Sequence, residues 1–450
     1  MTSVILINPW IYDFAAYDLW SKPLGLLYLA SYLKKQKIST HVIDCMDPYD
    51  PEMSNRLSGN MPVRRKYGTG KYNRKEITKP DGLKGINRAY SRYGIDPDIL
   101  KIHLKKIKNP SAILITSLMT YWYPGVIEAI NIAKKIHPGV PVILGGIYAR
   151  LCTDHALEYS GADIVADKVT LDNIKEFASI LTGTGISYHD NVDINSLYPA
   201  FDTYCRTDYI CLLTSTGCPF NCKYCASNFL YPSFSRRDPG DVVREIEYWN
   251  KRNHIIDFAF YDDALLVDSE SHIIRILEKI RQKGLKVRFH TPNAIHVKEI
   301  SYDIAALLFS SGFKTIRLGL ETSDFNIHNR LDNKVSQGDF ERAVKNLFNS
   351  GYGRKDIGAY ILMGLPGQSV ESVADTIKFA DKSGAIPYLA EYSPLPGTPL
   401  WEEAVTSSDY DIKGDPIFHN NTILPCWDEE KRQKVTYLKS MIREIRHNNN

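Results

Sequence analysis

Short runs of β-branched and aliphatic residues alternate, along the first half of the chain, with segments whose apolar residues recur at helical spacing. Each run is almost wholly apolar and is followed by a helical segment, which is typical of parallel strands buried on both faces. The helical segment 23–35 ends in two lysines, which suit a helix C-terminus. The pattern predicts a doubly wound parallel α/β sheet with five strands, at 4–7, 41–44, 112–117, 142–146 and 163–166.

An insertion over about 48–110 interrupts this alternation. Residues 62–75 within it hold six basic side chains and no acidic one, with Tyr67 and Tyr72 between them. Such a segment is more often a solvated basic loop than a binding site for an acidic ligand, and the pattern leaves both interpretations open.

A second alternation of strands and helices begins near residue 209. Six repeats predict a partial (β/α)6 barrel of the TIM type, since a full eight-unit barrel takes about 250 residues. Its strands are expected at 209–214, 256–261, 286–290, 315–320, 358–363 and 388–392. A charged amphipathic helix near 428–446 predicts a short helical C-terminal region. We therefore expect three domains, at 1–195, 205–400 and 401–450.

Composition excludes several classes of protein. The formal net charge of +3 over 450 residues gives no electrostatic reason to expect nucleic-acid or membrane binding. The first residues lack the basic region of a signal peptide, and no apolar run approaches the ~18 residues of a membrane helix. Eight cysteines in a chain of this length are too few for a disulfide scaffold. We expect a cytoplasmic protein with reduced thiols.

Three cysteines follow the first predicted barrel strand, at the carboxyl-terminal face where barrel enzymes keep their chemistry: Cys218, Cys222 and Cys225. A 4Fe-4S cluster that only carries electrons takes four thiolates, so a set of three leaves one iron free to hold another ligand. A structural zinc site is the alternative, because such sites are closed by four ligands and Cys205 or Cys211 is near enough in sequence to be the fourth.

The Cys-x3-Cys-x2-Cys spacing, with the aromatic Tyr224 just before the last cysteine, resembles the signature of the radical S-adenosylmethionine (SAM) superfamily. The resemblance covers about 205–400. It implies a 4Fe-4S cluster on the three cysteines, with its open iron chelated by the methionine moiety of SAM. It also implies a flavodoxin- or ferredoxin-type electron donor, and cleavage of SAM to methionine and a 5'-deoxyadenosyl radical. That radical would abstract hydrogen from a small-molecule or peptide substrate, which the protein binds and orients.

The same resemblance assigns cofactor contacts to the other strand ends of the barrel. Two carboxylates replace the Gly-Gly-Glu type motif with which the family contacts the methionine amino group, and a Gly-Leu-Glu-Thr segment resembles the family's Gly-Ile-Glu-Ser. Each residue has a structural alternative, as a helix cap, an ion-pair partner or a turn. The residues assigned to SAM are Tyr224, Asp262, Asp263, His290, Asn293, Glu321, Gly364 and Pro366.

The first half of the chain resembles the cobalamin-binding domain that precedes the barrel in one large class of these enzymes. The resemblance covers about 1–170 without the insertion, and it implies a floor for the corrin and a slot for its nucleotide tail. None of the twelve histidines stands in the Asp-x-His-x-x-Gly motif that supplies a cobalt ligand in many such domains. The residues assigned to cobalamin are Gly25, Leu26, Ser117, Thr120, Tyr121, Gly145 and Gly146.

Together these resemblances predict a cobalamin-dependent radical SAM enzyme that methylates an unactivated carbon. One alternative keeps the radical barrel for a non-methylating rearrangement or oxidation, with or without cobalamin. Another is a non-enzymatic iron-sulfur or corrinoid carrier, or a zinc-stabilised binding module. A methylthiotransferase is less favoured, because there is no second cysteine triad near the amino terminus. Cys426, beside Trp427 in the tail, is either near the barrel mouth or a small buried apolar residue.

Overall fold

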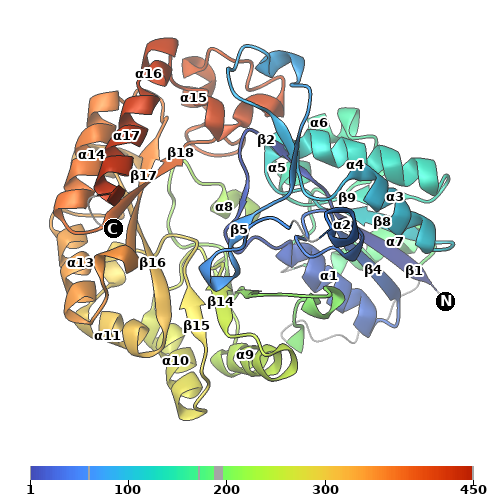
Figure 1. Ribbon diagram of the computed structural model, residues 1–450, viewed down its shortest axis with the longest axis horizontal. Helices are drawn as coiled ribbons and strands as arrows, with labels where there is room; N and C mark the ends of the chain where they lie inside the picture. The colour runs from blue at the N-terminus through green and yellow to red at the C-terminus, as the bar shows by residue number, and fades with distance from the viewer. Residues whose placement is uncertain (1, 59–60, 171–172, 187–195, 448–450) are drawn as a thin grey trace. The chain divides into compact units, whose positions relative to one another are not determined.

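A computed structural model describes residues 2–58, 61–170, 173–186 and 196–447 (Figure 1). The chain forms two compact units: Met1–Asp208 with Gly414–Phe418, and Tyr209–Lys413 with His419–Asn450. Within the tail, Gly414–Phe418 belongs to the first unit and the other residues from 401 on belong to the second.

The first unit is built on a five-stranded parallel sheet with the order β10-β9-β8-β1-β4. The order reverses between β1 and β8, which makes the carboxyl ends of these two strands the place where such sheets bind ligands. The predicted doubly wound sheet is confirmed. Its strands are β1 (Ser3–Asn8), β4 (Ser39–Asp44), β8 (Ala112–Ile115), β9 (Val142–Leu144) and β10 (Ile164–Val165).

Burial explains why β1, an interior strand of the sheet, is so apolar. The four side chains of β1 from Val4 to Ile7 are 0% exposed, and full burial of such a side chain contributes about 1.5–3 kcal/mol. The helices of this unit are α1 (Leu24–Lys35), α2 (Pro51–Arg56), α3 (Pro97–Lys106), α4 (Tyr123–Ile136), α5 (Ile147–Leu151), α6 (Thr153–Tyr159) and α7 (Glu176–Gly183).

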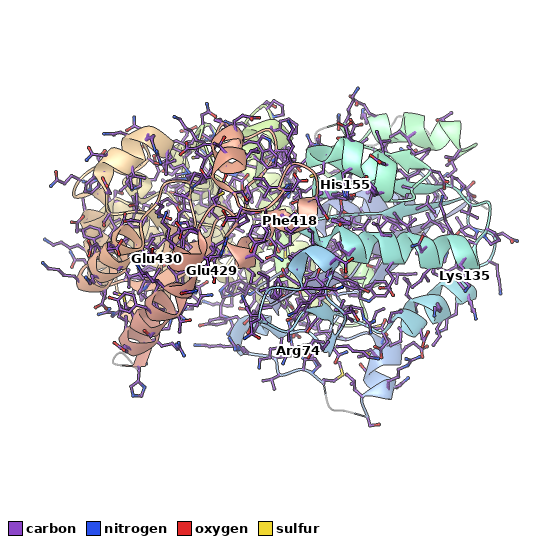
Figure 2. All side chains as sticks on the ribbon, turned by 90° about the horizontal axis from the view of Figure 1, so that it is seen from above. Arg74, Lys135, His155, Phe418, Glu429 and Glu430 are labelled. Carbon is purple, nitrogen blue, oxygen red and sulfur yellow. The ribbon has the colours of Figure 1, made fainter. Side chains whose placement is uncertain are left out.

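The insertion forms small antiparallel sheets with the segment that follows β1. One sheet has the order β2-β7-β6 and the other pairs β3 with β5. Arg64 of the basic segment lies 2.6 Å from the buried carboxylate of Asp18, while the other five basic side chains are exposed, among them Arg74 (Figure 2). One basic residue is therefore structural and five are solvated. The strands are β2 (Ile11–Asp13), β3 (Tyr17–Asp18), β5 (Gly70–Lys71), β6 (Arg74–Glu76) and β7 (Ser91–Tyr93).

The second unit is a partial barrel of six parallel strands that lie in sequence order, as predicted (Figure 1). The strands are β11 (Ile210–Leu212), β14 (Asp257–Phe260), β15 (Arg288–His290), β16 (Phe313–Glu321), β17 (Ile357–Met363) and β18 (Ile386–Glu391). The main helices between them are α9 (Pro239–Asn253), α10 (Ile273–Gln282), α11 (Tyr302–Ser310), α12 (Phe325–Leu331), α13 (Asp339–Asn349) and α14 (Val370–Lys382).

The tail of the barrel unit contains three helices, α15 (Trp401–Ser407), α16 (Glu429–Gln433) and α17 (Val435–His447). The single amphipathic helix expected near 428–446 is thus divided into two. Cys426 is buried, and its thiol lies 3.8 Å from the carbonyl oxygen of Ala404. Burial raises the pKa of this thiol to about 12, so Cys426 behaves as a packed apolar residue.

Gly146 and Gly139 form a matched pair for testing how tightly the strand ends of the first unit are packed. Both have positive φ, of 92° and 78°, but a Cβ on Gly146 would lie 2.2 Å from the carbonyl oxygen of Ser117, whereas one on Gly139 would meet nothing within 4 Å. We expect Gly139→Ala to lower the melting temperature by about 2–4 °C and Gly146→Ala to lower it at least twice as much. Scanning calorimetry of both variants measures this difference, and equal shifts would contradict the backbone contact.

Candidate active site

A cavity of about 270 Å³ lies at the carboxyl ends of the barrel strands, and all three cysteines line it. Its wall also contains polar groups from five consecutive barrel strands, β11 and β14 to β17, or the loops that follow them. These are Ser227 and Asp263, Asn293 and His296, Glu321 and Lys334, and Tyr360. The structure thus brings together six of the eleven barrel residues selected from the sequence: Cys218, Cys222, Cys225, Asp263, Asn293 and Glu321.

The cysteine loop is held at its base by a two-stranded ladder between β12 (Ser215–Thr216) and β13 (Ser235–Arg236). Gly217 begins the loop with φ 74°, and a Cβ there would lie 2.4 Å from the carbonyl oxygen of Ser233. Only glycine fits at this position. Further along, the backbone N–H of Lys223 donates to the carbonyl of Leu331 at 2.9 Å. The loop is therefore fixed at both its start and its middle.

The thiols fit an iron-sulfur cluster as ligands. Burial raises the pKa of Cys218 above its usual range and that of Cys222 to about 11, although the ammonium group of Lys334 partly opposes the shift at Cys222. These thiols hold their protons at neutral pH until a cation displaces them, and coordinated iron does so. Three convergent thiols beside a cation are the donor set that a cluster with one open iron requires.

Ser227, at the start of the short helix α8 (Ser227–Leu230), links the third cysteine to an acidic side chain. Its hydroxyl lies 3.2 Å from Sγ of Cys225 and donates to Oδ2 of Asp263 at 2.8 Å. Asp263 is accessible from the cavity, and partial desolvation by the surrounding wall raises the pKa of its carboxyl group. Asp263 thus stands beside the cysteine loop with one carboxylate oxygen fixed by Ser227.

The two neighbouring aspartates have opposite environments. Asp262 is 3% exposed and accepts hydrogen bonds from the backbone N–H and hydroxyl of Thr214 and from the hydroxyl of Ser215. It joins β14 to the strand end of β11 and does not line the cavity. Only one of the pair lines the cavity. The structure gives that position to Asp263.

His290 also lies outside the cavity. Its side chain is fully buried, with Nε2 2.9 Å from Oδ1 of Asp257 and Nδ1 3.2 Å from the hydroxyl of Thr315. Asn293, three residues later, does line the cavity, and its side-chain amide donates to the carbonyl of Tyr261 at 2.8 Å. Asn293 is therefore the residue after β15 that lines the cavity, whereas His290 links neighbouring strands inside the barrel.

Glu321 is presented by an irregular end of β16. The ladder between β16 and β17 shifts register between Gly319 and Glu321, and Glu321 has φ 61°, which is unusual for a residue with a side chain. A Cβ on Gly319 would lie 3.1 Å from Oε1 of Glu321, so the glycine leaves room for the carboxylate. Desolvation in the cavity raises the pKa of Glu321 to about 7, although Lys334 opposes the shift.

Lys334 is a cavity residue that the sequence pattern did not reveal. Desolvation alone would lower its pKa, but the attraction of Cys222 and Glu321 outweighs it and keeps the group protonated. Its backbone N–H donates to Oδ1 of Asp332 at 3.1 Å. The lysine lies in a loop after α12, away from any strand end. Its position in the sequence after the Glu321 segment is the only signal that could have indicated its place in the cavity.

Tyr224, Gly364 and Pro366 do not line this cavity. The hydroxyl of Tyr224 donates to Oδ2 of Asp332 at 3.0 Å. The backbone N–H of Gly364 donates to Oε1 of Gln368 at 2.9 Å, in the turn that contains Pro366. Their assignment to SAM rests on the family resemblance.

The strand ends of the first unit differ in how open they are. The hydroxyl of Ser117 donates to the carbonyl of Gly145 at 2.7 Å. A Cβ on Gly25 would meet nothing within 4 Å, and one on Gly145 would lie 4.0 Å from the carbonyl oxygen of Ala166, an ordinary contact. The side chains of Leu26, Thr120 and Tyr121 are buried. Gly25 and Gly145 therefore leave backbone accessible, as a flat macrocycle would require, while the other assigned residues support them.

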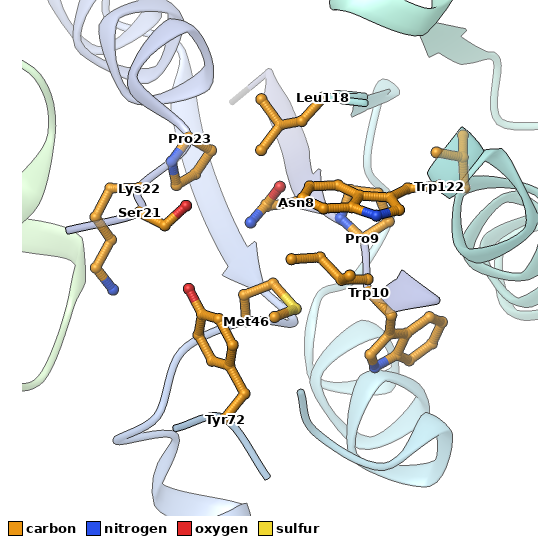
Figure 3. A pocket seen from close by; sticks show the side chains of 12 residues that line it. Asn8, Pro9, Trp10, Ser21, Lys22, Pro23, Met46, Tyr72, Leu118 and Trp122 are labelled. Carbon is orange, nitrogen blue, oxygen red and sulfur yellow. The ribbon is translucent and has the colours of Figure 1, made fainter. Parts of the chain in front are cut away.

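A second, much smaller cavity lies at the end of β1 (Figure 3). Its volume is about 20 Å³, which suits a water molecule. Lys22, Met46 and Trp122 are among its lining residues, and none of the seven residues assigned to cobalamin lines it.

The zinc alternative finds no support in the side chains. Among the residues whose positions the structure describes, no group of three or more histidine, cysteine, aspartate or glutamate side chains is placed to hold a single metal ion. Cys211 is buried within β11, and Cys205 is exposed in the first unit. In the same described part of the chain, no helix is both long enough and apolar enough to cross a membrane.

The comparison with protein families decides the identity of the barrel. Residues 212–380, which contain the three cysteines and the strand ends through β17, match the radical SAM superfamily. This part of the chain is a radical SAM domain. The cluster and SAM predicted from the cysteine spacing are the cofactors of this superfamily, and three cysteines around one cavity fit them.

Curated relatives of this radical SAM enzyme include several methyltransferases. An uncharacterized methyltransferase of Pyrococcus horikoshii is 26% identical over 69% of this chain and 72% of its own length. Bacteriochlorophyllide d C-12(1)-methyltransferase of Chlorobaculum tepidum is 23% identical, over 59% of this chain and 60% of its own. Anaerobic magnesium-protoporphyrin IX monomethyl ester cyclase of Cereibacter sphaeroides is 22% identical, over 61% and 50%.

Solved structures share the fold of the whole chain. TsrM from Kitasatospora setae, a radical SAM methyltransferase solved with tryptophan and a SAM analogue, has a TM-score of 0.65 at 15% identity over 99% of this chain and 89% of its own. It has also been solved with cobalamin and a 4Fe-4S cluster. The cobalamin-dependent radical SAM enzyme OxsB has a TM-score of 0.57 at 13% identity, over 99% of this radical SAM enzyme and 56% of its own chain. At these identities the likeness concerns the fold.

The two adjacent aspartates of the radical SAM barrel allow a sharp test of their different environments. Asp262→Ala leaves three donors of Thr214 and Ser215 without their acceptor, so we expect the unfolding free energy to fall by about 3 kcal/mol or more. Asp263→Ala should leave stability nearly unchanged and weaken SAM binding to the cluster-loaded protein at least tenfold. Thermal melts and equilibrium binding of SAM separate the effects. A large loss of stability in Asp263→Ala would contradict the assignment.

Proposed function

We propose that this protein is a cobalamin-dependent radical SAM methyltransferase that methylates an unactivated carbon atom. The observation that carries the proposal is the cavity lined by Cys218, Cys222 and Cys225 together with acidic, amide and cationic side chains. The methyltransferase names among the curated relatives, and the fold shared with TsrM, support the transfer of a methyl group.

The residues of the cavity would divide the binding of the cofactors between them. Cys218, Cys222 and Cys225 would hold the 4Fe-4S cluster, which when bound supplies the electron that cleaves SAM. Lys334, half-buried and protonated, suits the methionine carboxylate, and Asp263 or Glu321 suits the amino group. The apolar walls at Val297 and Val335 would exclude water from the reacting carbon.

The first unit would hold cobalamin, which supplies the methyl group when bound. Support comes from the shared fold and from the open backbone at Gly25 and Gly145 near the strand ends. Tyr121, buried beside Trp122 with its ring at 78° to the indole, would support this floor from beneath. A flavodoxin- or ferredoxin-type protein would provide the electrons. The substrate would be a small molecule or a peptide.

Cleavage of SAM tests the first part of the proposal. Anaerobically reconstituted protein, reduced with dithionite and incubated with SAM, should release 5'-deoxyadenosine. Cys222→Ala should lose more than 99% of this release together with the visible absorbance of the cluster, because a cluster held by three cysteines loses an essential ligand. Cys426→Ala is the matched control and should retain both. Release by Cys222→Ala at the unaltered rate would contradict the assignment.

Corrinoid binding tests the second part. Protein refolded or expressed with hydroxocobalamin should retain about one corrinoid per chain after gel filtration. Gly145→Phe should reduce retention at least tenfold, because the ring would add bulk at the strand end, where a Cβ meets only the carbonyl oxygen of Ala166, at 4.0 Å. Gly139→Phe, at a glycine that faces open space but lies in the loop before β9, is the control. Absence of corrinoid from the unaltered protein would overturn this part and leave SAM cleavage standing.

A second candidate is a non-methylating oxidation or cyclisation. One observation favours it, the 22% identity to the magnesium-protoporphyrin monomethyl ester cyclase. The mass of the product separates the candidates, because methylation adds a CH₂ unit and oxidation removes hydrogen.

A further inference from the structure

His296 is held against the loop that carries the cysteines. It begins a short turn after β15, and its carbonyl accepts a hydrogen bond from the backbone N–H of Glu299 at 3.2 Å. Its imidazole stacks on the ring of Phe220, with the centroids 4.4 Å apart and the planes at 29°. Phe220 stands between Cys218 and Cys222 in the sequence, so the stacking places the imidazole beside the cysteine loop.

The imidazole has a hydrogen-bonding group without a partner. His296 is 8% exposed and lines the cavity, yet its Nδ1 is buried and has no hydrogen-bond partner among the described residues. Other polar side chains of the cavity wall are paired: Asn293 with the carbonyl of Tyr261, and Tyr360 with the carbonyl of Pro292. A buried polar atom left unpaired costs about 1–3 kcal/mol, so such an atom in a binding cavity points to a ligand.

The charge state of His296 and of its neighbours indicates which kind of ligand atom its ring can bind. Burial and the nearby ammonium group of Lys334 lower the pKa of His296 to about 3, so the ring is neutral and carries one N–H. Phe220 is shared by both groups, since the Lys334 ammonium lies 5.6 Å from its ring centroid. A neutral N–H donor beside a loop of thiolates matches an anionic sulfur acceptor. Lys334 already offers a full charge to a carboxylate.

We propose that His296 donates a hydrogen bond to a sulfur of the cluster, either a cysteine thiolate or a sulfide, and thereby raises the reduction potential of the cluster. Hydrogen bonds to the sulfurs are one of the factors that set such potentials, because they stabilise the additional electron. His296 is thus a positioning and tuning residue and not a ligand of iron. The inference rests on the cysteines binding the cluster, and it is independent of cobalamin and of methyl transfer.

A redox titration without SAM tests the inference. His296→Leu removes the donor at similar volume, and His296→Gln retains an N–H. At a fixed applied potential we expect the ratio of reduced to oxidised cluster to be about tenfold lower in His296→Leu than in the unaltered protein, equivalent to a potential about 59 mV lower for a one-electron couple, with His296→Gln in between. Electron paramagnetic resonance of the reduced cluster gives the ratio, at equal iron and sulfide content.

A second measurement does not depend on the leucine variant folding. Pulsed electron paramagnetic resonance of the reduced cluster should detect a weakly coupled nitrogen. Its signal should change from that of ¹⁴N to that of ¹⁵N when the protein carries ¹⁵N-histidine, and this histidine signal should be absent from His296→Gln. An unchanged potential in His296→Leu, or no histidine coupling in the unaltered protein, overturns the inference. Weaker SAM binding without a shift in potential also overturns it, and assigns His296 to SAM instead. If the unaltered protein forms no cluster at all, the result contradicts the proposed function and does not bear on the hydrogen bond of His296.

Discussion

One buried carboxylate, that of Asp332, holds together the cysteine loop and the part of the cavity wall that contains Lys334. Its side chain is fully buried and both of its oxygens are used. Oδ1 lies 3.0 Å from Nδ1 of His328 and accepts the backbone N–H of Lys334, and Oδ2 accepts the hydroxyl of Tyr224. A buried charge needs such compensation, because an unpaired carboxylate in this position would cost several kcal/mol.

The hydrogen bonds of Asp332 also help to position the cysteine loop. Tyr224 belongs to the cysteine loop, whereas Lys334 belongs to the loop after α12, so Asp332 connects the two loops. His328 is fixed from its other side by the carbonyl of Thr322, just after Glu321, and its attraction to Asp332 keeps the pKa of the imidazole raised despite burial. The position of the Lys334 ammonium between Cys222 and Glu321 therefore depends on a set of hydrogen bonds that no cofactor has to supply.

The sequence allows the architecture and the cysteine site to be predicted, because both depend on local patterns. Apolar runs separated by helical segments predicted both sheets, and a three-cysteine spacing after a strand predicted the cluster loop. The direction of individual side chains did not follow from such patterns. Asp262 and Asp263 are adjacent and chemically identical, and only the hydrogen bonds from Thr214 and Ser215 decide which one faces the cavity. The involvement of Lys334, Asp332 and His296 depends on loops from distant parts of the chain.

The electrostatic balance of the cavity explains why a lysine and a neutral histidine stand together there. A cluster on three thiolates is anionic and gains a further negative charge on reduction, so positive charge and N–H donors stabilise it. Lys334 supplies one charge. A second cation at His296 would repel Lys334 inside a region of low dielectric, and burial keeps that imidazole neutral. Glu321, with its pKa raised to about 7, can be neutral when the cavity is empty and charged when a cationic amino group enters. The cavity thereby avoids fixed excess charge in either state, and the protein keeps a site that is stable before its cofactors bind.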